Sequence, residues 1–341
     1  MKIVYLIGNG FDLNLGLKTK FRHFYDYYIK QESPITVVNI FKKDLDEHKN
    51  IEQWADLELV LGDYAKYFYD NTVLNFRKLL IDIQDKLAEY INLQTTNFAL
   101  TETDEKKINE DLFFPNKYLT PREKSAFLSY KNNFDLHEYI ADVITFNYTD
   151  TFEKFYSFNG KSKKLGTHLN GYNDYPNTLN SVEHIHGTTK SNMILGINDV
   201  SQLNNEELRK NLKAIRSIVK PEMNKNAGTL RDERSLKLIR EADLLCVYGM
   251  SLGATDKIWW KAICDRLINS NSVIIIFTVN DGTPEIRGFL SEDDKDEIKE
   301  KLTSYGIFSD SQLKDVLDRI FVCINSKMFT ISSLSHKKSA A

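Results

Sequence analysis

The sequence predicts an α/β protein built on a doubly wound, mainly parallel β-sheet, and three observations support this fold class. Short apolar runs of strand length recur along the 341 residues, and several are apolar at successive positions, as buried parallel strands are. Segments with helical periodicity separate most of these runs. Two runs pass directly into glycine-bounded turns. With 42% hydrophobic residues, the chain can bury the core that such a sheet requires.

The expected elements follow in chain order. Strands are predicted at residues 3–7, 143–146, 184–185, 193–197, 244–248, 273–279 and 320–324, and helices at 204–219, 229–242, 254–269 and 291–305. Polar stretches rich in acidic residues, or in Gly and Asn, predict loops at 101–107 and 159–180. The tail at 331–341 has no apolar pattern and is expected to be flexible.

One long interval, residues 21–139, interrupts the alternation. It holds helical patterns and few strand signals, so it predicts a helical insertion that packs on, or roofs, an α/β core formed by residues 1–20 and 140–330. An amphipathic stripe at spacings of three and four supports a helix there, and its members are Trp54, Leu57, Leu61, Tyr64 and Phe68. Three acids in the same stretch are interpreted as a solvated or capping face, with service in a pocket as the alternative: Asp56, Glu58 and Asp63.

Charge and cysteine usage narrow the class of protein. The chain has 45 Lys and Arg against 48 Asp and Glu, so no global field attracts nucleic acid or an anionic membrane. Basic residues between 209 and 240 alternate with acids, which favours a solvated helical face over a nucleic-acid groove.

Scattered cysteines without a C-x-x-C pair, at Cys246, Cys264 and Cys323, are typical of buried thiols in a reducing compartment, and we expect a cytoplasmic protein.

The apolar runs are too short for a membrane protein. None approaches the roughly 18 to 20 residues that a transmembrane helix needs. The run at residues 3–7 leads straight into a glycine turn, so we expect a first strand there rather than a signal peptide.

Two glycine turns are candidate ligand-binding segments. Gly8-Asn9-Gly10-Phe11-Asp12 follows the first predicted strand, and Gly249-Met250-Ser251 follows the strand at 244–248. Glycines there allow a phosphate to approach the backbone at the start of a helix. Leu13 stands where the third glycine of G-x-G-x-x-G would fall, and an ordinary tight turn is the alternative for each segment.

Polar residues at strand ends are the second group of candidates. Asn147 and Asp150 follow the strand at 143–146, and Asn280 follows the strand at 273–279, where the carboxyl ends of parallel strands face a ligand. The alternative for the first pair is a turn that caps the next helix. His184 and His186 offer proton transfer near neutral pH, with His184 the better candidate for a packed structural residue. A zinc site is not expected, because no third ligand stands at a suitable spacing.

The motifs together resemble two known groups of proteins. The glycine turn after the first strand, then Phe-Asn-Tyr at 146–148, His-Ile-His-Gly at 184–187, Gly-Met-Ser-Leu at 249–252 and Val-Asn at 279–280 resemble the SIR2-like NAD-binding fold of sirtuins and bacterial SIR2-type NAD hydrolases. This resemblance covers the core only. The segments LIGNGFDLNLGL at 6–17 and WADLE at 54–58 are closer to the AbiH family of bacteriophage abortive-infection proteins, a resemblance that spans the chain.

The resemblance implies roles for individual residues on a SIR2-like, Rossmann-like sheet. Gly8, Asn9 and Gly10 stand at the phosphate-binding turn, with Asn9 in place of alanine, and Asp12 stands where serine is usual. Further matches are Asn147 by the nicotinamide ribose, His186 as the catalytic histidine, Ser251 in the second turn after Gly249, and Asn280 near the adenosine half. Phe11 lies within the first turn. The paired cysteines of the sirtuin zinc ribbon are missing, so protein deacetylation is not expected.

The resemblance thus implies an abortive-infection effector that takes NAD as its substrate, without a metal, and cleaves the bond between nicotinamide and ribose. Asn147 would position water or ribose, His186 would accept a proton, and Asp150 would offset developing positive charge. Hydrolysis and cyclisation both stay open. A non-catalytic sensor of NAD or ADP-ribose and a nuclease are the alternative functions. A phage-derived trigger and a homo-oligomer are possible partners, whereas nucleic acid and membrane are not expected.

Overall fold

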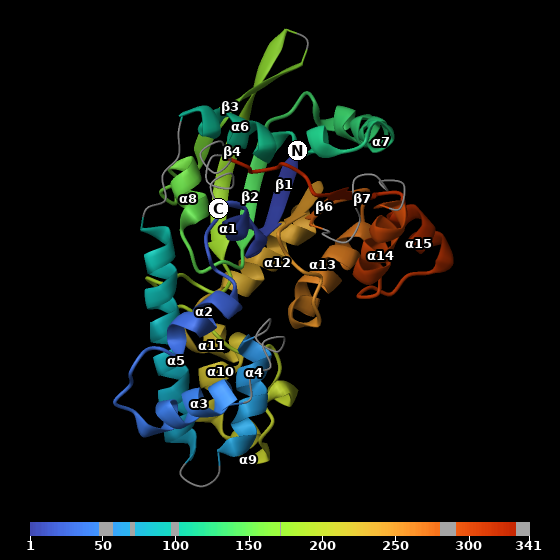
Figure 1. Cartoon of the computed structure of the whole chain (residues 1–341). Coiled ribbons are helices and arrows are strands. Elements are labelled where there is room, and N and C mark those ends of the chain that lie inside the picture. Colours follow the sequence, from blue (N-terminus) through green and yellow to red (C-terminus); the bar gives the residue numbers. More distant parts are fainter. Residues whose placement is uncertain (48–56, 69–71, 97–101, 171, 280–290, 332–341) are drawn as a thin grey trace.

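The computed structural model describes residues 1–47, 57–68, 72–96, 102–170, 172–279 and 291–331. Their strands form one seven-stranded sheet in the order β3-β4-β2-β1-β5-β6-β7 (Figure 1). All neighbouring strands in it run parallel except β3 and β4. The strands are β1 Lys2–Ile7, β2 Tyr139–Thr145, β3 Lys163–Asn170, β4 Asn173–His184, β5 Leu244–Tyr248, β6 Val273–Thr278 and β7 Ile320–Ile324.

The sheet reverses its direction of growth at β1. From β1 the chain adds β2 and β4 on one side, then returns to place β5, β6 and β7 on the other. The six parallel strands therefore follow the order 3-2-1-4-5-6 of doubly wound, Rossmann-like sheets. The fold class predicted from the sequence is confirmed at this level. Ligands of such sheets bind beyond the carboxyl ends of the strands at the reversal point, here between β1 and β5.

Helices surround the sheet and extend beyond it. Their bounds are α1 Gly10–Asn14, α2 Phe21–Tyr28, α3 Thr36–Glu47, α4 Leu57–Tyr64, α5 Thr72–Thr95, α6 Glu102–Phe113, α7 Pro121–Lys131, α8 Thr151–Tyr156, α9 Glu206–Lys210, α10 Leu212–Ile218, α11 Lys220–Asn226, α12 Arg231–Glu241, α13 Lys257–Ile268, α14 Ser291–Thr303 and α15 Asp310–Leu317. Short 3-10 helices are η2 Ala65–Tyr67, η3 Pro115–Tyr118, η4 Asn132–Phe134, η5 Val200–Gln202 and η6 Ala254–Asp256.

Both faces of the sheet are buried, because side chains alternate along each strand. Tyr5 and Ile7 face a cluster covered by α1, α6, α7 and α8. Val4 and Leu6 face the opposite cluster, covered by α12, α13, α14 and α15. This two-sided burial explains why the central strands read as continuous apolar runs. No helix among the described residues is long and apolar enough to cross a membrane.

A separate group of helices lies beyond the carboxyl ends of the strands (Figure 1). We call α2–α5 together with α9–α11 the helical lobe. It has its own apolar cluster, in which Phe41, Leu61 and Phe76 from the first set of helices join Leu208 and Ile218 from the second. The lobe therefore combines part of the 21–139 segment with residues that follow β4.

The 21–139 segment divides between two locations. Its described residues before β2 contain helices and no strand, in keeping with the helical pattern of the sequence. Helices α2–α5 join the lobe, whereas α6 and α7 pack on the sheet through Ile108, Leu112 and Phe127. The loop predicted at 101–107 is wrong from Glu102 onward, because α6 begins there.

Three further predictions of secondary structure, at residues 159–180, 193–197 and 204–219, differ from the structure. The loop predicted at 159–180 is wrong, because β3 and β4 form a hairpin there that projects past the sheet (Figure 1). The strand predicted at 193–197 is wrong, because that apolar run forms only a single bridge, Ile197 to Val219, and packs in the lobe. The predicted helix 204–219 is two helices, since Asn211 caps a new start at α10.

Candidate functional site

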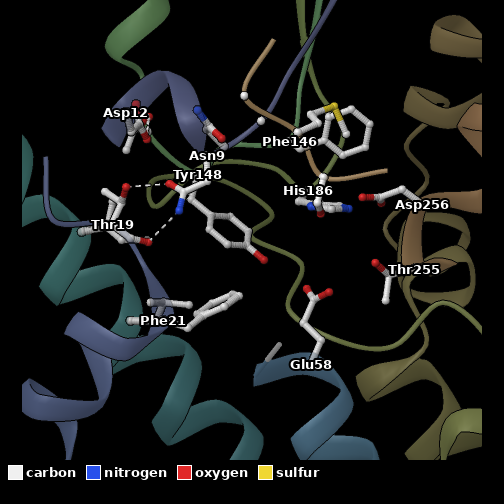
Figure 2. Close-up of a pocket in the computed structure, with 18 of the residues that line it drawn as sticks. Asn9, Asp12, Thr19, Phe21, Glu58, Phe146, Tyr148, His186, Thr255 and Asp256 are labelled. Carbon is white, nitrogen blue, oxygen red and sulfur yellow. Dashed lines mark hydrogen bonds between the residues drawn. The ribbon is translucent and has the colours of Figure 1, made fainter. Parts of the chain in front are cut away.

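A cavity of about 250 Å³ opens at the reversal point of the sheet. The carboxyl ends of β1, β2 and β5 form one wall, and the helical lobe forms the other. Figure 2 shows the polar side chains that reach into it from both walls. The volume is close to the lower end of the 300–1,000 Å³ that is usual for small-molecule sites. This is where a doubly wound sheet binds its ligand.

The two glycine turns pack directly against each other at the floor of the cavity. Gly8 N–H donates to Tyr248 O at 2.9 Å, and Gly10 N–H donates to Gly249 O at 2.8 Å. A Cβ on Gly10 would lie 2.4 Å from Gly249 Cα, and Gly249 itself has a φ of +65°. Glycine is therefore required at both places by the backbone contact. The sequence predicted phosphate contacts there, but in this structure the Gly8 and Gly10 N–H groups already have partners within the protein.

Asn9 and Phe11 serve the architecture of the first turn. Asn9 Nδ2 donates to Thr19 O at 3.1 Å, and Thr19 Oγ1 donates to Asn9 Oδ1 at 2.6 Å, so this side chain ties the turn to the entrance of α2. Phe11 is only 1% exposed and packs among Phe152 and Phe155 in the sheet core. The prediction that Phe11 contacts a ligand is therefore wrong, because its side chain is buried in the sheet core and does not line the cavity.

Asp12 is a buried carboxyl group on the wall of the cavity. Thr149 Oγ1 donates to both carboxyl oxygens, at 3.0 and 2.8 Å, and Thr151 Oγ1 donates at 2.7 Å. Burial raises the pKa of Asp12 to about 6, although the two hydroxyl groups lower it in part. The group thus titrates near neutral pH and joins α1 to the loop after β2.

Asn147 and His186 meet at the same cavity, as the sequence predicted for two strand ends. Their exposed fractions are 6% and 8%. Within the described residues, no group hydrogen-bonds to the Asn147 side-chain amide. Burial, and then the positive charge of Lys220, lower the pKa of His186 well below its usual value. His186 is therefore neutral at pH 7 and has a nitrogen able to accept a proton. Gly249 and Ser251 also line this cavity.

His184 has a structural position behind Asn147. Its Nδ1–H donates to Asn147 O at 3.0 Å, and its Nε2 lies 2.5 Å from Glu153 Oε1. Burial alone would lower the pKa of His184, but the hydrogen bond and charge of Glu153 raise it above the usual value. The interpretation of His184 as a packed structural residue fits these contacts.

Asp150 lies away from the cavity. Asp150 pairs with Lys154 at 2.8 Å and with Lys190 at 2.7 Å and is not part of the lining. The expectation that Asp150 faces a ribose is wrong, because two surface lysines hold the carboxylate elsewhere. Asn280 lies outside the described residues, so its predicted role stays a prediction.

Several lining residues were not among the predicted site residues, and four of these have a charged or phenolic side chain. Glu58 of α4 and Lys220 of α11 form an ion pair at 2.5 Å, with side chains 11% and 6% exposed. Tyr148, 9% exposed, donates its hydroxyl to Ile194 O, and Asp256 lines the cavity from η6. The interpretation of Glu58 as a solvated face is wrong, because α4 packs its polar edge toward the sheet. The two partners stand 162 residues apart, so no local pattern links them.

A sequence profile of the family described as bacteriophage abortive infection AbiH matches residues 4–278. The chain belongs to this AbiH family. Membership gives the protein a role in bacteriophage abortive infection. The matched range contains every lining residue from Gly8 to Asp256. Among curated proteins, no relative matches the chain.

The side chains that line the cavity of this AbiH-family protein offer several kinds of chemistry. Among the described residues, no group of three or more His, Cys, Asp or Glu is arranged to hold a metal ion. The cavity instead offers a neutral imidazole, a primary amide, one lysine and carboxyl groups on Asp12, Glu58 and Asp256. Such a set can orient a polar ligand, accept a proton and oppose a developing positive charge.

Proposed function

We propose that this AbiH-family protein is an effector with a SIR2-like site that cleaves NAD at the bond between nicotinamide and ribose. The observation that carries the proposal is the meeting of Asn147 and His186, both more than nine-tenths buried, in one cavity at the reversal point of the sheet. Loss of a central cofactor would stop the growth of an infected cell, which accounts for abortive infection.

The reaction needs orientation and electrostatics more than covalent chemistry. The C1′–N bond breaks and its electron pair leaves with nicotinamide, which neutralises the pyridinium ring. Positive charge then develops on the ribose, and the carboxyl groups of Asp12, Glu58 and Asp256 stand where they can oppose it. Water bonds to C1′ and gives its proton to the neutral His186, while the free amide of Asn147 orients the water or a ribose hydroxyl. These three carboxyl groups, and not Asp150, therefore offset the developing positive charge in the proposed reaction.

The test is nicotinamide release from NAD by the purified wild type, by His186→Ala and by Asn147→Ala. We expect each substitution to lower turnover by about 100-fold or more, the usual contribution of a positioned acid–base group. Binding of ADP-ribose should change much less. His168→Ala and Asn116→Ala are matched controls, because these residues are similarly buried, at 7% each, and do not line the cavity. Thermal melts check that each variant folds.

Two results would reject cleavage by this site. Undiminished turnover in both variants would place the reaction elsewhere. Saturable binding of NAD or ADP-ribose without nicotinamide release would instead favour a nucleotide sensor at the same cavity. We also propose that a phage-derived trigger and assembly into a homo-oligomer control the activity. The assay is therefore run with and without lysate of infected cells, and the mass of the protein in solution is measured in both conditions.

A further inference from the structure

The Glu58–Lys220 ion pair contains the one lysine among the described cavity residues, and the proposed reaction gives this lysine no role. The two groups come from different helices of the lobe, lie 2.5 Å apart and are almost fully withdrawn from solvent. Both line the cavity that holds His186. Figure 2 shows the Glu58 carboxylate directed from α4 into the cavity, on the side where His186 and Tyr148 lie. A buried charge pair of this kind strongly influences neighbouring ionisable groups.

The charged groups around His186 act in opposite directions. The positive charges of Lys220 on α11 and Arg231 on α12 disfavour protonation of the imidazole ring of His186. Glu58 on α4 and Asp256 on η6 place carboxyl groups on the same lining, and Tyr148 adds a phenol. Asp12 stands on the sheet wall of the cavity. Lys220 is the group whose charge acts most directly on His186, and Glu58 is the partner that fixes the position of that charge.

We propose that Lys220, held in place by Glu58, keeps His186 in its neutral, proton-accepting form. The helical lobe then contributes charge to the site as well as a wall. Lys220 supplies the field that opposes a cationic imidazole, and Glu58 holds the ammonium group in place and makes its burial tolerable. In this role both are positioning residues, because they act through His186. The inference rests on the proposed function in so far as His186 is the base of that reaction.

The direct test is NMR titration of ring-labelled histidine, with the His186 signal assigned by its loss in His186→Gln. In the wild type we expect the His186 ring to stay neutral well below the usual histidine value near 6.5, because burial and the charge of Lys220 lower its pKa. Lys220→Met should raise the His186 midpoint by about one pH unit or more, since it removes a nearby like charge. Glu58→Gln should not raise it, because the opposing carboxylate is lost while the lysine remains.

Lys295→Met is the matched control. Lys295 is also a buried lysine, 7% exposed at its side chain, and pairs with Glu123 at 3.0 Å far from the cavity. Its removal should leave His186 unchanged. If Lys220→Met does not fold, Lys220→Gln removes the same charge with a polar side chain. An unchanged His186 midpoint in the folded lysine variant, or a rise in Glu58→Gln as large as in the lysine variant, overturns the proposal.

A second readout separates this inference from the proposed reaction. If the protein cleaves NAD, the acid limb of its kcat/KM profile should move to higher pH in Lys220→Met and stay in place in Lys295→Met. A merely structural loss would lower the whole profile without moving the limb, and that result counts against the proposal. The titration itself needs no turnover. If nicotinamide is never released but the His186 midpoint moves as expected, the reaction is rejected and the charge coupling stands.

Discussion

Asp12 shows how one carboxyl group links the cavity to the stability of the fold. Its pKa is about 6 in the folded chain, against an ordinary value of 3.8, chiefly because it is buried. Between these two values the folded state binds more protons than the unfolded state, so stability falls as pH rises from about 4 to 6. Above pH 6 the ionised, buried group costs the fold about 3 kcal/mol.

Asp12→Asn should therefore gain stability relative to the wild type as pH increases. The amide cannot ionise, and its oxygen can still accept hydrogen bonds from Thr149 and Thr151. We expect the difference in unfolding free energy, variant minus wild type, to rise by about 2–3 kcal/mol from below pH 4 to above pH 6. Urea unfolding across this range measures it. Asp315→Asn, in an exposed pair with Arg319, should give a flat difference. A flat profile for Asp12→Asn would contradict the assignment.

A site residue could be predicted from the sequence where the residues next to it in the chain show its place in the fold. Asn147 comes just after the apolar strand β2, and His186 belongs to a His-Ile-His-Gly segment that begins at the end of β4, so the sequence places both at the correct edge of the sheet. Asp150 has the same local signal, but Lys154 and Lys190 draw its carboxylate to the surface. Glu58 has a signal typical of a solvated helix face, and only the packing of α4 against Lys220 makes it a cavity residue. Contacts between distant segments carry no local pattern.

At the scale of elements, the two interlocked turns are the most sensitive part of the site. Gly10→Ala would place a Cβ against the Gly249 backbone, which has no room to move without shifting β5. We expect a loss of about 3 kcal/mol or more of unfolding free energy, together with loss of ligand binding. Gly253→Ala is the matched control from the second turn. There φ is −80° and the nearest atoms lie 3.5 and 3.6 Å away, so the cost should stay below about 1 kcal/mol. Equal effects of the two variants would contradict a steric requirement at Gly10.

Elements with a strong apolar pattern were predicted well, and those with a polar pattern were not. Strands β1, β5, β6 and β7 appear where the sequence places them, because burial on both faces leaves a continuous apolar run. The β3–β4 hairpin stands at the sheet edge and carries Thr, His, Asn and Tyr, so it reads as a loop. The run at 193–197 is apolar because it fills the lobe, not because it joins the sheet. Helix α15 lies outside the predicted helices, although the capping box of Ser309 and Gln312 is a sequence signal for its start.

At the scale of the whole molecule, two parts of the protein form the cavity: the sheet with its covering helices, and the helical lobe. Each part has apolar clusters of its own. The sheet supplies Gly8, Asn147 and Gly249, whereas the lobe supplies Glu58 and Lys220. The sequence predicts a helical segment near the sheet, but not which of its helices roof the site. Amphipathic helices that pack on a sheet and those that pack on one another show the same periodicity. Only the tertiary contacts separate α2–α5 from α6 and α7.

Hydrogen exchange can test whether both parts bind the ligand. With ADP-ribose as the probe, we expect slower amide exchange at residues 8–12 and 146–149 on the sheet side, and also in α4 and around Leu87 and Ile91 of α5. The β3–β4 hairpin, which does not line the cavity, serves as the internal control and should not change. Protection restricted to the sheet side would contradict a two-walled site.

The order in which the lining is encoded has a consequence for the cell that makes the protein. The lining runs from Gly8 to Asp256 in a chain of 341 residues. During translation, Asn147 and His186 leave the ribosome well before the second glycine turn that completes the enclosure around them. A nascent or truncated chain thus carries the proposed reacting groups without the wall that orients them. If the protein cleaves NAD as proposed, this activity would therefore begin only after the segment up to Asp256 has been made.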